Sequence, residues 1–196
     1  MSNNTKRKNI LANFLFEAQV LKRVQRTGWQ ILGENEESIS EHLYLTSIIT
    51  FILAKQMKVN TEKVLTMALF HDFHETRVGD VDKIGLNYLK RDVEKANKDI
   101  FEKLSFGKEL LQLLIEYEEK KSLEAKLVYE ANVIALTIEL KTLVDKGSIH
   151  AKEWLEANKE RVRLKESKAL IKEIMHTDSQ DFWKEIRDKL HGSFKK

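Results

Sequence analysis

No proline occurs among the 196 residues of this chain, and only seven residues are glycine. An average composition, with proline near 5%, would supply about ten prolines. These two residue types interrupt helices most strongly, and the remaining sequence is rich in leucine, lysine, glutamate, alanine and isoleucine. The sequence therefore predicts an all-α protein.

The composition is that of one globular domain. Charged residues make up 33% of the chain and apolar residues 42%, and the net charge of +3 comes from interleaved signs. No basic block suggests nucleic-acid binding, and no run of about 18 apolar residues suggests a membrane span. Cysteine is absent, which excludes disulfides and thiolate chemistry. We expect a cytoplasmic protein with a flexible tail over residues 1–8, one domain over 9–191 and a tail over 192–196.

Residues that begin and end helices divide the chain into expected elements. Ser40 is the expected N-cap of a second helix that is apolar on nearly every face, which predicts a central, buried position. Ser122 and Gly147 are expected to bound a long apolar helix. Gly28 and Gly33 break the chain after the first helix. The expected helices cover about 9–26, 40–58, 60–72, 87–104, 108–120, 122–147, 150–160, 165–176 and 179–190.

A histidine and an aspartate stand side by side, as His71–Asp72, where the apolar run 64–70 stops. Adjacent residues on a helix point about 100° apart, so both side chains reach one point only where a helix is ending. Polar groups placed beside a core need a partner, and a divalent cation can satisfy nitrogen and oxygen donors together. With His42 from the preceding helix, the pair predicts a metal site.

Three further side chains offer chemistry around this site. Glu75 lies three residues past Asp72 and would share its face in a helical turn, where it can act as a general acid or base. The guanidinium of Arg26 can form two hydrogen bonds with a phosphate, and the flat indole ring of Trp29 can pack against a sugar or base. Taken alone, Arg26 is more simply a solvated charge, and Trp29 is a side chain of the core or surface. The remaining histidines would make structural hydrogen bonds. Spacing alone leaves both interpretations open.

The order of these segments resembles the HD-domain phosphohydrolases. Within that family it is similar to the branch that contains bacterial 5′-deoxyribonucleotidase and its eukaryotic HD-domain-containing relatives. The resemblance spans roughly residues 10 to 185. The matching segments are Arg26–Trp29, Glu37–His42, His71–Thr76 with Gly79–Asp80, Glu116–Glu119 and Ser122–Val128.

This resemblance implies an HD-type helical bundle that hydrolyses (deoxy)nucleoside 5′-monophosphates to nucleoside and phosphate. It implies one divalent ion, which would be Mn, Co, Ni, Fe, Zn or Mg, and a small-molecule nucleotide as the partner. Apolar helix faces beyond the needs of one core would indicate a homodimer. The implied roles are metal ligation by His42, His71, Asp72 and a residue of the long helix, catalysis by Glu75, phosphate binding by Arg26, and a sugar site shaped by Trp29 and Asp80.

The chain departs from the family pattern at the expected fourth ligand. Asn132 follows the segment Lys126–Ala131, where the family carries an aspartate. An amide oxygen can coordinate a hard cation but brings no negative charge, so metal affinity should fall. Two hypotheses follow. The chain is an active phosphomonoesterase, as the retained Arg26, Glu75 and Asp80 favour, or it is a catalytically weakened or inactive HD-fold protein that binds a nucleotide or phosphate.

Overall fold

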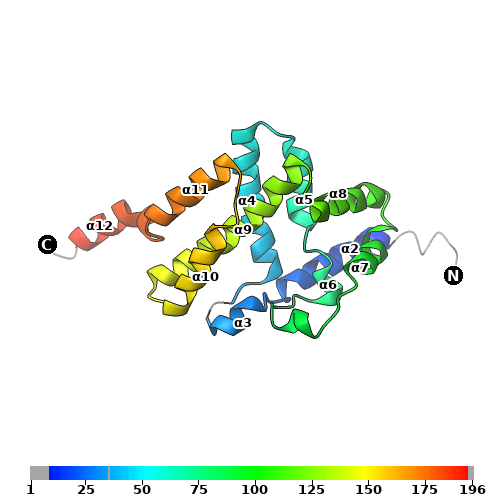
Figure 1. Cartoon of the computed structure of the whole chain (residues 1–196), viewed down its shortest axis with the longest axis horizontal. Helices are drawn as coiled ribbons and strands as arrows, with labels where there is room; N and C mark the ends of the chain where they lie inside the picture. Colours follow the sequence, from blue (N-terminus) through cyan, green and yellow to red (C-terminus); the bar gives the residue numbers. More distant parts are fainter. Residues whose placement is uncertain (1–8, 35, 194–196) are drawn as a thin grey trace.

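The computed structural model describes residues 9–34 and 36–193. These residues form helices and no extended strand, which confirms the predicted all-α class (Figure 1). The predicted tail 1–8 and residues 194–196 lie outside the described residues, and the last helix continues through Gly192. The α-helices are α2 (Ile10–Ala18), α3 (Gly28–Leu32), α4 (Ile39–Met57), α5 (Thr61–Phe70), α6 (Glu75–Val78), α7 (Val93–Phe101), α8 (Gly107–Glu119), α9 (Leu123–Asp145), α10 (Ile149–Lys159), α11 (Lys165–His176) and α12 (Lys184–Ser193).

The long helix α9 forms the centre of the molecule. It packs against α4, α5, α8, α10 and α11, and α4 also packs against α5. The fully buried side chains of Leu53, Met67, Leu127 and Ile134 fill the space where α4, α5 and α9 meet. The predicted metal ligands come from α4 and from the end of α5, so this packing brings them together.

Helix α4 is buried on one side only, unlike the all-round burial that its apolar sequence predicts. Leu53 faces the core, whereas Tyr44, Ile48, Phe51 and Ile52 are exposed. No helix in the described part of the chain is long and apolar enough to cross a membrane. The exposed side of α4 is therefore an apolar surface that the described residues leave uncovered.

A cluster of phenylalanine rings fixes the segment that follows α5. Phe14 of α2 stacks on Phe73 with ring centroids 5.0 Å apart, and Phe70 and Phe101 pack edge-on at 5.9 Å. Phe73 is almost completely buried. Because Phe73 directly follows Asp72, this cluster holds the backbone of the expected ligand in place.

The first helix ends earlier than the predicted range of 9–26. α2 stops at Ala18, and a 3₁₀ turn, η1 (Gln19–Lys22), follows. Beyond it, the Arg26 N–H donates to the Glu37 carbonyl at 2.8 Å, and the Ile39 N–H donates to the Val24 carbonyl at 2.9 Å. The backbone of residues 24–26 is therefore paired with the segment before α4 and cannot continue a helix.

The predicted N-cap at Ser40 is wrong, because α4 is capped by Ser38. The Ser38 hydroxyl accepts from the Glu41 N–H at 3.3 Å, and the Glu41 carboxylate accepts from the Ser38 N–H at 2.7 Å. This Ser-x-x-Glu capping box was readable in the sequence. The earlier start places His42 in the first turn of α4, facing inwards.

Among the other helix boundaries, local capping signals predicted both ends of α9 but not the limits of two other helices. Ser122 caps α9 by accepting from the Ala125 N–H at 3.1 Å, and Gly147 has a φ of +98° after its end, as predicted. The predicted helix 87–104 instead begins at Val93, behind the cap Asp92. The predicted helix 179–190 is divided into a 3₁₀ turn, η3 (Asp181–Trp183), and α12. The short helices α3 and α6 were not anticipated.

Candidate metal centre and cleft

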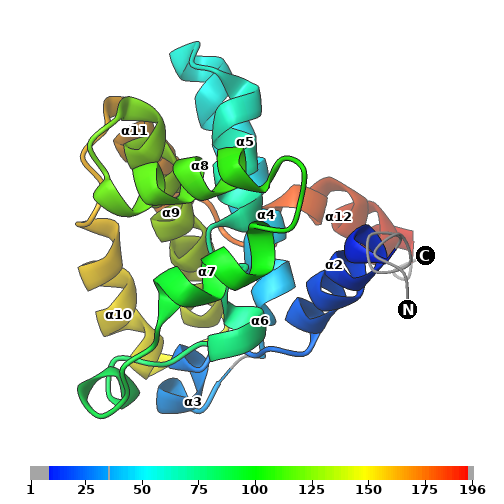
Figure 2. The same cartoon turned by 90° about the vertical axis from the view of Figure 1, so that its right-hand side faces the viewer.

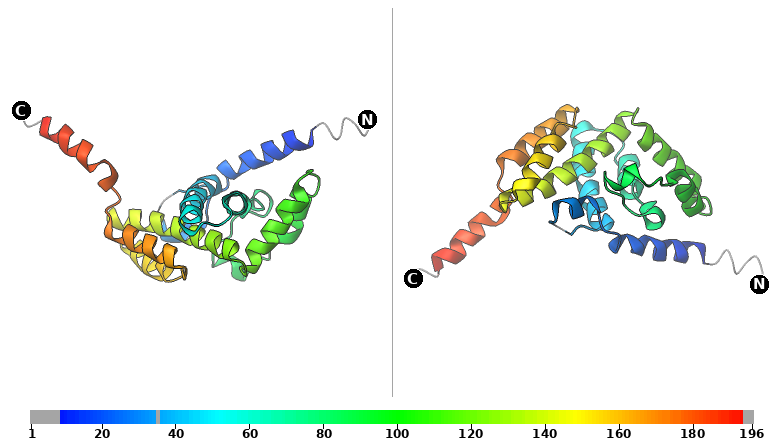
Figure 3. Two further views of the ribbon diagram at one scale, coloured as in Figure 1. Left: turned by 90° about the horizontal axis from the view of Figure 1, so that it is seen from above. Right: turned by 60° about the horizontal axis from the view of Figure 1, so that its bottom comes forward.

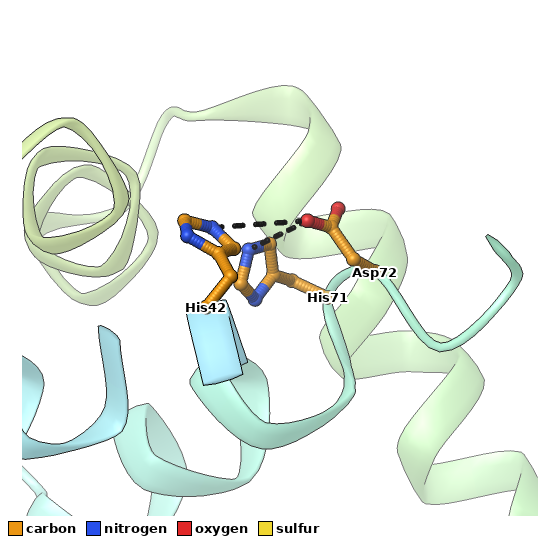
Figure 4. A group of neighbouring side chains, drawn as sticks. All are labelled: His42, His71 and Asp72. Atoms are coloured by element: carbon orange, nitrogen blue, oxygen red, sulfur yellow. Dashed lines mark ion pairs between the residues drawn. The ribbon is translucent and has the colours of Figure 1, made fainter. Parts of the chain in front are cut away.

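His42, His71 and Asp72 converge on one point. Figure 4 shows both imidazole rings turned toward the Asp72 carboxylate. His71 Nε2 lies 3.2 Å and His42 Nε2 3.9 Å from Asp72 Oδ2. One ligand atom of each residue lies within 4.8 Å of the other two. Both histidines are buried, so the cluster is a preformed set of nitrogen and oxygen donors.

The tautomer of His71 is fixed by its own helix. His71 follows the last residue of α5, and its Nδ1 lies 2.8 Å from the Ala68 carbonyl oxygen. A carbonyl can only accept, so Nδ1 carries a proton, and in the neutral ring Nε2 is the nitrogen left with a lone pair. Nε2 is buried and has no hydrogen-bond partner among the described residues. Metal-binding histidines typically donate the N–H of their other ring nitrogen to a carbonyl or carboxylate, as His71 does to Ala68. The arrangement therefore fits a divalent ion.

Charge and burial compete within this cluster. Burial lowers the pKa of His42, and the nearby Arg26 guanidinium lowers it further. Burial also opposes protonation of His71, but the Asp72 carboxylate outweighs it and raises the pKa of that imidazole. For Asp72, burial favours the neutral acid, yet the two imidazoles hold its pKa well below the usual range. Asp72 is therefore an ionised carboxylate, as a metal ligand must be.

Glu37 lies beside His42 on the side of its Nδ1 atom, away from Asp72. Its Oε1 lies 3.7 Å from His42 Nδ1, while its Oε2 accepts from the Trp29 indole N–H at 2.9 Å and pairs with Arg26 Nε at 3.2 Å. Burial opposes ionisation of Glu37, but His42 and Arg26 lower its pKa overall. Trp29 itself is buried in the core between α9 and α10. Trp29 and Arg26 thus contact the carboxylate that lies beside His42.

Glu75 opens α6 next to the cluster. Arg91 Nη1 donates to Glu75 Oε1 at 3.2 Å and to the Gly79 carbonyl at 3.0 Å, while Glu75 Oε2 is buried without a hydrogen-bond partner in the described structure. Burial and the charges of Asp72 and Asp80 raise the pKa of Glu75 to about 8. The carboxyl group therefore retains its proton near neutral pH. Figure 2 shows α6 beside α7, at the end of α4 that carries His42.

Asp80 holds the start of α3. Its Oδ2 accepts from the Thr27 backbone N–H at 2.6 Å and from the Thr27 hydroxyl at 3.2 Å. These bonds tie the loop after α6 to the turn that carries Arg26 and Trp29. The carboxylate predicted to shape a sugar site is thus engaged with backbone that borders the cleft.

Asn132 lies on α9 and faces the same region. Its Nδ2 donates to the Tyr117 hydroxyl at 3.3 Å, and the Tyr117 ring packs 5.2 Å from the ring of His71. Burial raises the pKa of Tyr117, so its hydroxyl stays neutral. With its nitrogen directed to Tyr117, the amide of Asn132 leaves Oδ1 as the atom that can serve as a ligand.

A cleft of about 300 Å³ joins these residues. It contains charged groups from four separate parts of the chain. Its apolar section is formed by Leu136 of α9 and Trp154 of α10. Its volume is near the lower end of typical small-molecule sites. Its lining includes Arg26, Trp29, Asp72, Glu75, Asp80, Lys83, Arg91, Asn132, Leu136, Trp154 and Arg161.

The family model for the HD domain matches residues 18–185, which is most of the chain. This chain belongs to the HD-domain family. The match confirms the predicted HD-type bundle and covers every residue of the candidate site.

This HD domain is similar to curated enzymes and to solved structures. It is 37% identical to the human 5′-deoxynucleotidase HDDC2 over 124 residues, which cover 60% of each chain. It is 35% identical to the 5′-deoxynucleotidase YBR242W of Saccharomyces cerevisiae, over 67% of this chain and 59% of the yeast protein. The chain thus spans about three fifths of these relatives. A conserved hypothetical protein from Pyrococcus furiosus matches with a TM-score of 0.74 and 28% identity, over 85% of this chain and 99% of that one.

The site of this HD domain also contains residues that the sequence analysis did not assign. Glu37 supports His42, Arg91 binds Glu75, and Tyr117 contacts Asn132. His74, interpreted as structural, is buried beside Asp72 and Glu75 and could share a metal with them. Glu37 lies within the resembling segment and was detectable there. Tyr117 lies within the matching segment Glu116–Glu119 but had no role assigned to it, whereas Arg91 lies outside the matching segments and only the folded chain brings it in.

Proposed function

We propose that this HD domain is a metal-dependent phosphomonoesterase that hydrolyses (deoxy)nucleoside 5′-monophosphates to nucleoside and phosphate. The observation that carries the proposal is the convergence of His42, His71 and Asp72 on one point, with Asp72 and Glu75 lining one cleft. The names of the related 5′-deoxynucleotidases support the choice of substrate. A single domain over residues 9–191 and a cytoplasmic location stay predictions from the sequence.

One divalent ion would be held by His42, His71 and Asp72, with Oδ1 of Asn132 as the fourth donor. Two imidazoles combined with oxygen donors suit Mn²⁺, Fe²⁺, Co²⁺, Ni²⁺ or Zn²⁺, whereas Mg²⁺ prefers oxygen ligands. When bound, such an ion polarises a phosphoryl oxygen and lowers the pKa of water. His71 Nε2 is buried without a hydrogen-bond partner in the described structure, and such an ion would satisfy it.

The remaining residues divide the work of binding and proton transfer. Glu75, whose pKa is raised to about 8, can donate its proton to the leaving 5′-oxygen. Arg26 borders the cleft with its guanidinium and can contact a phosphate while it remains paired with Glu37. Asp80 keeps the Arg26–Trp29 turn against the cleft, and the buried Trp29 borders the cleft where the sugar would lie.

The test is phosphate release from a panel of ribo- and deoxynucleoside 5′-monophosphates with Mn²⁺, Co²⁺, Ni²⁺, Zn²⁺ or Mg²⁺. Activity with at least one transition metal, removed by a chelator and restored by that metal, is the expected result. 3′-Monophosphates serve as the matched control, because they place the phosphate on the other side of the sugar. Absence of turnover under every condition would contradict the proposal.

The alternative is a weakened or inactive HD-fold protein that binds a nucleotide or phosphate. The observation that favours it is Asn132, which brings no charge to the position of the fourth metal ligand. Its amide N–H donates to the Tyr117 hydroxyl. Nucleotide binding without turnover, in the presence of metal, would support this alternative.

Replacement of Asn132 with aspartate should tighten metal binding by at least about tenfold. A carboxylate adds a full charge near the cation, and two opposite charges about 4 Å apart at a protein site attract by several kcal/mol. The Tyr117 hydroxyl can rotate to donate to the new carboxylate, so the hydrogen bond can be kept. Calorimetric titration with Mn²⁺ measures the change. Asn13→Asp adds the same charge to the exposed surface of α2 and should leave the affinity unchanged; equal affinity in both variants would remove Asn132 from the metal site.

We also propose that the chain forms a homodimer through the exposed apolar faces of α2, α4 and α12. Figure 3 (left) shows α2 and α12 extending from the same side of the molecule, with α4 between them. Phe182 of η3 and Ile186 of α12 lie four residues apart and are 86% and 61% exposed. A helix of ten residues is marginal in water unless its apolar face is packed. A second copy of the chain would cover these faces reciprocally.

Disruption of this surface should separate the dimer. The double variant Phe182→Asp/Ile186→Asp is expected to raise the dimer dissociation constant at least about tenfold, because buried aromatic and aliphatic anchors dominate interface energies. Light scattering across a concentration series measures it. Ile149→Asp, which changes an isoleucine that is 83% exposed at the start of α10, is the control. A parent protein that is monomeric at all concentrations would contradict the proposal.

A further inference from the structure

Arg161 follows the end of α10 and is held firmly in place at the edge of the cleft. Its Nη1 donates to Asn158 Oδ1 at 3.0 Å, and its Nη2 donates to the Tyr129 hydroxyl at 2.9 Å. The guanidinium carbon also lies 5.5 Å from the centre of the Tyr129 ring. Two hydrogen bonds from different directions and a ring contact fix the plane of the guanidinium.

The groups that hold Arg161 are themselves anchored. Asn158 is buried, and its Nδ2 donates to the Val133 carbonyl at 2.8 Å and to the Thr137 hydroxyl at 3.0 Å. Arg161 is therefore linked through Asn158 to the central helix α9, although it is exposed itself. A long side chain that is already ordered loses little conformational freedom when it binds a ligand.

The charge of Arg161 is available, because both of these partners are neutral. The other two arginines of the cleft are paired with carboxylates, Arg26 with Glu37 at 3.2 Å and Arg91 with Glu75 at 3.2 Å. Arg161 instead binds an amide oxygen and a phenol. A guanidinium has five N–H donors, so three remain for a ligand after these two bonds.

The spacing of residues along α9 shows where Arg161 lies relative to the candidate ligand Asn132. Tyr129 precedes Asn132 by three residues, so both lie on one side of α9, about one turn apart. Arg161 and Asn132 line the same cleft as Asp72 and Glu75. Trp154 and Leu136 line the cleft as well, with Leu136 four residues beyond Asn132 along α9. Along α9, Arg161 and the apolar section therefore lie on opposite sides of the candidate fourth ligand.

We propose that Arg161 binds the phosphate group of the substrate from the side of the cleft opposite to the apolar section. The proposal rests on the proposed function, because it takes the metal end of the cleft as the phosphate end. A phosphomonoester dianion would accept from the free N–H groups of Arg161, and the nucleoside would lie toward Trp154. Arg161 is thus a substrate-binding residue, and Tyr129 positions it.

Binding of inorganic phosphate to the Mn²⁺-loaded protein tests this directly. Arg161→Ala should weaken phosphate binding about 10- to 100-fold in calorimetry, since hydrogen bonds to charged groups are the stronger ones. Arg161→Lys keeps the charge and should recover part of the loss. Tyr129→Phe removes one bond that holds Arg161 and should cause a smaller loss. Thermal unfolding of each variant verifies that the fold is intact.

Arg163→Ala is the matched control. Arg163 lies two residues further on, is exposed, and donates to the carbonyls of Glu160 and Val162 away from the cleft lining. Its loss should leave phosphate affinity unchanged. Equal phosphate affinity in Arg161→Ala and the parent, equal weakening in Arg163→Ala, or no phosphate binding by the parent would each overturn the proposal.

Turnover measurements separate this proposal from the proposed function. In an active enzyme, Arg161→Ala should raise KM for every nucleotide by a similar factor, because the phosphate is common to all. A changed base preference with unchanged phosphate affinity would overturn the proposal by assigning Arg161 to the nucleoside. Phosphate binding that depends on Arg161 in a protein that hydrolyses no nucleotide would support Arg161 and refute the nucleotidase.

Discussion

Replacement of Glu75 with glutamine should lower the rate of phosphate release by about 10²–10⁴-fold, the usual worth of general acid–base catalysis. The amide cannot supply a proton, but its oxygen can still accept from Arg91, as Glu75 does at 3.2 Å. Burial, Asp72 and Asp80 raise the pKa of Glu75 to about 8, so its ionised form is destabilised in the folded state. A neutral amide should therefore not lower the melting temperature.

Steady-state kinetics with saturating Mn²⁺ measure this effect, together with metal content and thermal unfolding. Glu62→Gln, which alters an exposed glutamate in the first turn of α5, is the matched control and should retain full activity. A Glu75→Gln rate within about threefold of the parent would exclude proton transfer by Glu75.

Replacement of His42 with alanine should abolish stoichiometric metal binding and, with it, turnover. Loss of a residue that only orients a ligand typically weakens metal binding 10- to 100-fold, so loss of a ligand should exceed about 100-fold. His42 is completely buried, and its removal also leaves a cavity that lowers stability. Elemental analysis after metal loading and dialysis, supported by a melting curve, measures the change.

Asp72→Asn provides the second measurement if His42→Ala does not fold. Asp72 is partly exposed, and asparagine keeps its shape while removing the ligand charge. His150→Ala is the control, since His150 is exposed at the start of α10. Metal content equal to that of the parent in both His42→Ala and Asp72→Asn would contradict the metal site.

Glu37 and Arg91 show which roles the sequence could not assign, although Glu37 itself lies within a matching segment. Each is one charged residue among many, and 33% of the chain is charged. Their roles arise from contacts with His42 and Glu75, and the Arg91–Glu75 contact joins residues 16 positions apart. No local pattern encodes such a contact, because it depends on where the loop after α6 returns to the core.

The sequence by itself determined the helical class, the existence of the long helix α9 and the place where an apolar helix ends in His71–Asp72. These features follow from local rules, since proline and glycine content, capping residues and apolar spacing act over a few residues. The tertiary structure alone decided which nitrogen of His71 is free, how Asn132 is turned toward Tyr117, and that Arg161 is anchored beside the cleft. The physical reason is that each depends on contacts between helices, and packing fixes these contacts only when the whole chain is folded.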